Sequence, residues 1–119
     1  MRVVLTFSPN RGGQVATVFL LTLSCQTTED STGADEAYLN FNGSRIFGPT
    51  SINDGESREI GVFRTFFGQA TVDLFDEDSP DADDHLGGII VRSSEAGLGQ
   101  RVQAFTGDDA HYTILYEVR

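Results

Sequence analysis

The sequence has no lysine, no tryptophan, a single cysteine and no long apolar run. Cys25 therefore cannot form a disulfide within the chain, and we interpret it as a buried free thiol. Because no stretch approaches the ~20 apolar residues of a membrane-spanning helix, we expect no transmembrane segment. The lack of tryptophan counts against a carbohydrate-binding module, which would display exposed coplanar aromatic rings.

Basic residues are also scarce, since eight arginines face 18 acidic residues and the formal net charge at pH 7 is −10. Such a surface repels nucleic acid and anionic bilayers unless bound cations neutralise it. We therefore expect no nucleic-acid partner. The acidic, lysine-free composition also fits a salt-rich habitat or a GC-rich genome, and we expect a prokaryotic source.

The acidic residues are concentrated in two short windows that contain no basic residue. These ten acids are Glu29, Asp30, Asp35 and Glu36 in the first window, and Asp76, Glu77, Asp78, Asp81, Asp83 and Asp84 in the second. The rest of the chain has eight acidic residues against eight arginines and is neutral. A generic solvating surface would spread its excess charge, so this concentration indicates a cation site.

The residue pattern predicts an all-β fold, because segments rich in β-branched and aromatic residues alternate with Gly, Asn, Asp and Pro clusters. We expect strands at Val3–Phe7, Gln14–Cys25, Ala37–Phe41, Arg45–Gly48, Arg58–Phe66, Gln69–Phe75, Gly88–Arg92, Arg101–Phe105 and His111–Val118. Asn42-Gly43 and Phe67-Gly68 predict tight turns. The expected fold is one domain over residues 1–119, an antiparallel β-sandwich of about eight strands.

Strand order predicts that the two acidic windows lie at the same end of this sandwich. Successive antiparallel strands reverse direction, so connections separated by two strands emerge together. The same parity brings Asn53–Glu56, and also Asp108-Asp109, to this end. Left without a cation, the gathered carboxylates would repel each other and raise one another's pKa values.

Calcium is the cation that this residue set favours, because it takes six to eight oxygen ligands from flexible loops. The segment after Asp76 lacks the glycine and the terminal glutamate of an EF-hand loop. Magnesium keeps its waters and usually needs phosphates, and one cysteine with two distant histidines is no zinc site. The candidate ligands are Asp30, Asp35, Glu36, Asp76, Asp78 and Asp84.

The second window resembles the third calcium loop of a C2 domain. That loop has an Asp-x-Asp pair, a third Asp eight residues after the first and a Gly three residues later, and this chain has Asp76, Asp78, Asp84 and Gly87. The first window is similar to the first loop of the family, although Asp35-Glu36-Ala37-Tyr38 replaces Asp-Pro-Tyr. At the family spacing, either Asp30 pairs with Glu36 or Glu29 pairs with Asp35.

The resemblance runs from about Val15 to Val118 and implies a C2-like sandwich that binds Ca²⁺. It also implies a calcium-dependent contact with an anionic lipid or a protein, although the missing lysines remove the basic faces that many members use. The alternatives are a structural or adhesive extracellular domain stabilised by calcium, and a carbohydrate-binding module. We expect no enzyme and no catalytic residue, and an extracellular or cell-surface location.

Three other features have simple structural interpretations. His85 is expected at the surface, and Asp54-Gly55 is expected to be a plain turn. The aromatic residues Phe63, Phe66, Phe67 and Phe75 are expected to pack in the core, because residues alternate between the two faces of a strand.

Overall fold

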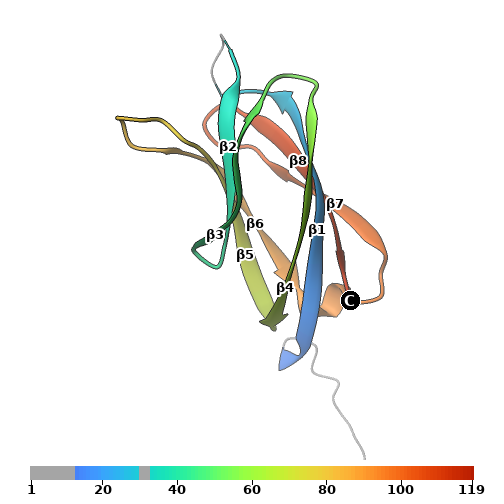
Figure 1. The fold of residues 1–119 in the computed structure, drawn as a ribbon. Coiled ribbons are helices and arrows are strands. Elements are labelled where there is room, and N and C mark those ends of the chain that lie inside the picture. The colour runs from blue at the N-terminus through green and yellow to red at the C-terminus, as the bar shows by residue number, and fades with distance from the viewer. Residues whose placement is uncertain (1–12, 30–32) are drawn as a thin grey trace, which may run out of the picture.

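Two four-stranded antiparallel sheets pack face to face (Figure 1). The computed structural model describes residues 13–29 and 33–119. Its strands are β1 (Val15–Thr27), β2 (Asp35–Phe41), β3 (Ser44–Ile52), β4 (Ser57–Phe67), β5 (Gln69–Asp76), β6 (Asp84–Arg92), β7 (Gln100–Phe105) and β8 (His111–Val118). These eight match eight of the nine expected strands, and the ninth, Val3–Phe7, lies outside the described residues. A short 3₁₀ helix, η3 (Ser93–Glu95), follows β6.

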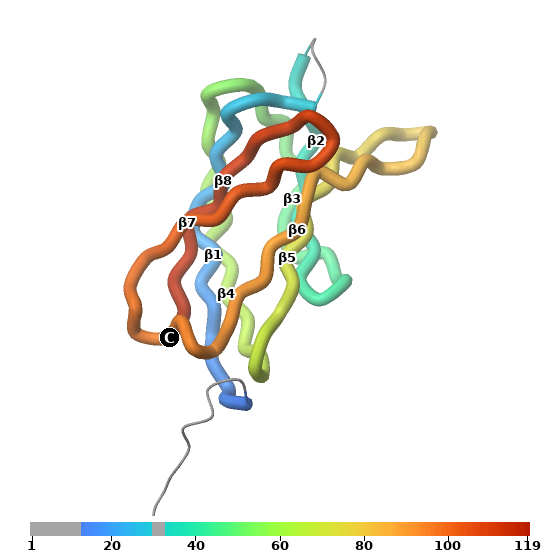
Figure 2. The backbone as a smooth tube through the Cα atoms, turned by 180° about the vertical axis from the view of Figure 1, so that it is seen from behind, coloured from blue at the N-terminus to red at the C-terminus, as the bar shows by residue number. Residues whose placement is uncertain are grey.

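The strand order in the two sheets is β4-β1-β8-β7 and β3-β2-β5-β6. Every neighbouring pair is antiparallel, so each strand runs opposite to the one before it along the chain. The connections β1–β2, β3–β4, β5–β6 and β7–β8 therefore share one end, as strand parity predicts (Figure 1). The view from behind shows the β7–β8 turn at the same end (Figure 2).

The core lies between the sheets and is built by residues that alternate along each strand. In β8, for example, Tyr112, Ile114, Tyr116 and Val118 point inward and are almost fully buried, while the intervening residues are more exposed. Cys25 is buried and free, as expected. Burial of such side chains contributes roughly 25 cal/mol for each Å² of apolar surface removed from water.

The expectation that all four phenylalanines pack in the core is wrong for two of them. Phe66 is buried, but Phe63 and Phe67 are 60% and 67% exposed. Phe66 and Phe67 are consecutive in β4, so they must point to opposite faces of the sheet. Phe63 lies on the outer face with Phe67, where its ring packs against Phe19 at a centroid distance of 5.5 Å.

Candidate metal centre

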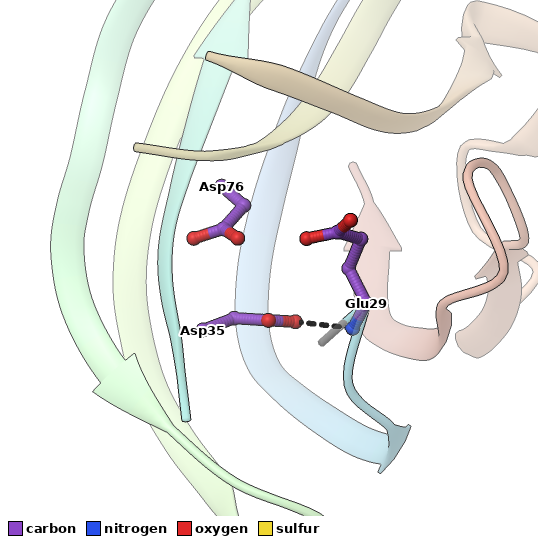
Figure 3. Close-up of side chains that lie close together, drawn as sticks. All are labelled: Glu29, Asp35 and Asp76. Atoms are coloured by element: carbon purple, nitrogen blue, oxygen red, sulfur yellow. Dashed lines mark hydrogen bonds between the residues drawn. The ribbon is translucent and has the colours of Figure 1, made fainter. Parts of the chain in front are cut away.

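Three carboxylates meet where β1 leaves one sheet and β2 begins in the other (Figure 3). Asp35 is the first residue of β2 and Asp76 is the last residue of the neighbouring strand β5. Their exposed fractions are 0% and 4%. Glu29 reaches them from the β1–β2 connection, and one carboxylate oxygen of each residue lies within 4.8 Å of the other two. We name Glu29, Asp35 and Asp76 the inner group.

Asp35 has one carboxylate oxygen that is supported and one that is not. Its Oδ2 accepts hydrogen bonds from the Tyr112 hydroxyl at 2.5 Å and from the Glu29 backbone N–H at 2.9 Å. Its Oδ1 is buried, and no donor among the described residues reaches it. A buried acceptor without a partner costs about 1–3 kcal/mol, and more when it is charged. The inner group therefore offers an oxygen ligand that a cation would satisfy.

Asp76 shows the electrostatic cost of this crowding. Burial raises the pKa of Asp76 from 3.8 to about 6, and the negative charges of Asp35 and Asp78 add to the rise. The backbone N–H of Glu36, which donates to Asp76 Oδ1 at 2.7 Å, opposes this change. The raised pKa means that the ionised carboxylate destabilises the folded protein, and a bound divalent cation would reverse that effect.

A second set of three carboxylates shares Glu29 with the inner group. It consists of Glu29, Asp84 at the start of β6 and Asp108 in the β7–β8 connection, again with one oxygen of each within 4.8 Å of the others. We name Glu29, Asp84 and Asp108 the outer group, because Asp108 is exposed and Asp84 is only partly buried. Carboxylates from three connections therefore converge at this end.

The β5–β6 connection, residues 77–83, is held by a carboxylate that the sequence analysis did not single out. Asp83 accepts hydrogen bonds from the Tyr38 hydroxyl and from the Asp78 backbone N–H, the latter at 3.2 Å. The hydrogen bond from Tyr38 lowers the pKa of Asp83. The Tyr38 ring is itself fixed between the Phe75 ring, at 5.2 Å, and the Arg45 guanidinium, at 3.8 Å. Asp83 thus ties the connection to the outer face of its sheet.

The β3–β4 connection supports the β1–β2 connection in a similar way. Asp54 Oδ1 accepts a hydrogen bond from the backbone N–H of Thr28 at 2.8 Å. The backbone N–H of Gly55 donates to the Cys25 carbonyl oxygen at 2.8 Å. Asp54-Gly55 is therefore a turn, as expected, and it positions the chain immediately before Glu29.

The structure distributes the six candidate ligands unequally. Asp35 and Asp76 lie in the inner group and Asp84 lies in the outer group. Glu36 and Asp78 are exposed and belong to neither group, and Asp30 lies outside the described residues. Of the two pairs left open for the first window, the structure brings Glu29 and Asp35 together.

Two residues of the groups, Glu29 and Asp108, are absent from the predicted ligand set. The six-residue spacing of Glu29 and Asp35 was the signal for the first of them. Asp108 had only strand parity in its favour, because the β7–β8 connection resembles no loop pattern that we identified.

Other polar features of the described residues offer no catalytic arrangement around these carboxylates. His85 is exposed and pairs with Asp73 at 2.9 Å, which agrees with a surface histidine. Two depressions of about 380 and 290 Å³ lie along β6 and β7, and neither is lined by a residue of the two groups. Among the described residues, no helix has the length and apolar character needed to cross a membrane.

Comparison with known proteins shows the fold. No family model and no curated protein matches the sequence. Among solved structures, one C2 domain is similar over 87% of this chain and 96% of its own, with 12% identity and a TM-score of 0.55. A C2 domain of plant extended synaptotagmin 1 is similar over 92% and 95%, with 13% identity and a TM-score of 0.55.

A third similar structure contains two C2 domains of extended synaptotagmin 2 with calcium bound. It covers 93% of this chain and 47% of its own length, with 18% identity and a TM-score of 0.57. At such low identity these likenesses establish the fold alone. The chain has a C2-like, all-β sandwich fold.

Proposed function

We propose that this protein is a calcium-binding module and that the inner group holds the ion. The observation that carries the proposal is Asp35 Oδ1, a fully buried carboxylate oxygen without a donor among the described residues, within a group of three carboxylates. Calcium prefers oxygen ligands and accepts irregular geometry, so Glu29, Asp35 and Asp76 suit it better than zinc or magnesium. C2-like folds solved with calcium support the same choice.

The ion contributes a concentrated positive charge at an end of the molecule that otherwise carries only acidic side chains. In this proposal the protein positions the ion and leaves some coordination positions for a phosphate or carboxylate of a partner, such as an anionic lipid or a protein. The module binds and does not catalyse, since its carboxylates are committed to the ion and its depressions lie elsewhere.

A calcium titration by calorimetry tests the proposal. The wild-type protein should bind calcium, and Asp76→Asn should weaken that binding by roughly tenfold or more, because it removes a charged ligand. Asparagine can still accept the backbone hydrogen bond from Glu36, so the fold is kept. Asp81→Asn is the matched control, because Asp81 is exposed in the same region and belongs to neither group. Absence of calcium binding, or equal affinity in wild type and Asp76→Asn, would refute the proposal.

A second candidate function is a structural or adhesive extracellular domain in which calcium only stabilises the loops. The four connections at the acidic end contain no basic residue and no large apolar side chain, which favours this candidate over membrane docking. Extracellular calcium would keep such a site filled at a dissociation constant of roughly 10⁻⁴ to 10⁻³ M. Co-sedimentation with anionic liposomes separates the candidates, because only lipid docking predicts calcium-dependent recruitment.

A carbohydrate-binding module has less support. Phe63 and Phe67 are exposed, but the Phe63 ring is tilted by 32° against Phe19 instead of lying coplanar with it. The Arg119 guanidinium also covers Phe19, at 4.4 Å from its centroid. These rings do not form the flat platform on which a sugar ring would stack.

A further inference from the structure

The β7–β8 connection is pressed against the start of β6 by a close contact between backbone atoms. The backbone N–H of Gly107 donates to the Leu86 carbonyl oxygen at 2.7 Å. A Cβ atom at Gly107 would lie 2.8 Å from the Leu86 carbonyl carbon, and one at Gly87 would lie 3.0 Å from the Thr106 nitrogen. Neither position has room for a side chain, so two glycines are needed for the connections to approach this closely.

This contact determines where Asp108 lies. Asp108 follows Gly107 directly, and the turn is closed by a hydrogen bond from the Ala110 N–H to the Gly107 carbonyl oxygen at 3.0 Å. Asp108 has a φ of 54°, in the left-handed region that Asp tolerates better than most residues. Its carboxylate is thereby held beside Asp84 and Glu29 in the outer group, whereas the adjacent Asp109 is in neither group.

We propose that Asp108 is a ligand of a second calcium subsite, formed by the outer group, and that Glu29 bridges this subsite to the inner one. This inference rests on the proposed function and adds the β7–β8 connection to the site. The two groups together contain five carboxylates, namely Glu29, Asp35, Asp76, Asp84 and Asp108. When all are ionised, one calcium ion leaves three negative charges uncompensated and two ions leave one.

An independent observation indicates that this joint site takes a cation. Asp35 is fully buried and faces the other two carboxylates of the inner group, and its Oδ1 has no donor among the described residues (Figure 3). Glu29, whose carboxylate lies in both groups, links that buried oxygen to Asp84 and Asp108. Since calcium often shares carboxylates and fills six to eight positions, Glu29 can serve two ions at once.

The number of bound ions tests the inference. Calorimetric titration of the calcium-free wild-type protein should give two bound calcium ions. Asp108→Asn should retain the first binding event and weaken the second by roughly tenfold or more, because a charged ligand is lost. Asp109→Asn is the matched control, since Asp109 is the next residue, is exposed and also has a positive φ of 65°. It should bind two ions as the wild type does.

The possible results separate this inference from the proposed function. One ion in the wild type, or two ions with an unchanged second event in Asp108→Asn, would overturn the second subsite and leave the calcium module intact. Loss of both events in Asp108→Asn would also overturn it, because Asp108 would then be part of a single site. Absence of any binding by the wild type would overturn both proposals.

Discussion

Asp76→Asn is expected to stabilise the protein when calcium is absent, although it removes a proposed ligand. Burial and neighbouring carboxylates raise the pKa of Asp76 from 3.8 to about 6. A shift of about two units means that ionised Asp76 costs the folded state about 3 kcal/mol at neutral pH. Asparagine removes this charge, and its Oδ1 can still accept the Glu36 N–H hydrogen bond of 2.7 Å. We therefore expect a gain of about 2–3 kcal/mol, or roughly 8–12 °C in melting temperature.

The sign of the effect follows from the direction of the pKa shift. Because the pKa of Asp76 is higher in the folded protein, its favourable contribution is complete below about pH 3.8 and is lost as the pH rises through about 6. Replacing Asp76 with Asn makes this contribution independent of pH. The stability gain of the variant should therefore shrink to about 1 kcal/mol at pH 4.5, where folded Asp76 is mostly protonated.

Thermal unfolding followed by circular dichroism, with a chelator present, measures this gain at pH 7.5 and pH 4.5. Asp81→Asn is again the control, because an exposed carboxylate should change the melting temperature little at either pH. Saturating calcium should reverse the order, since the wild type gains binding energy that Asp76→Asn lacks. The reasoning is refuted if Asp76→Asn is no more stable than wild type in chelator at pH 7.5.

Three further predictions concern the same structure. Saturating calcium should raise the wild-type melting temperature by roughly 5–10 °C if it binds only the folded state, and a melting curve indifferent to chelator and calcium would contradict every calcium proposal. Tyr112→Phe removes a donor from buried Asp35 and should cost about 1–3 kcal/mol in urea denaturation with chelator, so an unchanged midpoint would show that the hydrogen bond contributes nothing. Phe66→Ala should cost about 3–5 kcal/mol by the same assay and Phe67→Ala less than about 1 kcal/mol, whereas equal losses would mean that the register of β4 is wrong.

The strands and their order could be predicted because they depend on local patterns. Alternating apolar residues specify a strand with one buried face, and Asn42-Gly43 supplies positive φ angles of 48° and 86° for a tight turn. Strand parity then placed the acidic connections at one end without any knowledge of side-chain positions. The aromatic residues of β4 were harder, since Phe66 and Phe67 are equally apolar and only the packing of the sheets decides which one is buried.

The composition of the metal centre was only partly predictable for the same reason. Charge and spacing placed Asp35, Asp76 and Asp84 among the candidates. They could not distinguish Glu29 from Asp30, because adjacent residues in a connection differ in direction only once both neighbouring strands are in place. Asp108 was beyond their reach, since the contact that positions it joins Gly107 to Leu86 across 21 residues of the chain.

Properties that need only short segments were readable from the chain itself: strand periodicity, turn chemistry, the segregation of negative charge and the end at which that charge gathers. The folded arrangement was needed to learn which carboxylates face one another, which oxygen is left without a donor and which connection joins the site. These depend on side-chain direction and on backbone approach between distant segments. Distances of a few ångströms govern the electrostatic energy there, and a linear pattern does not contain them.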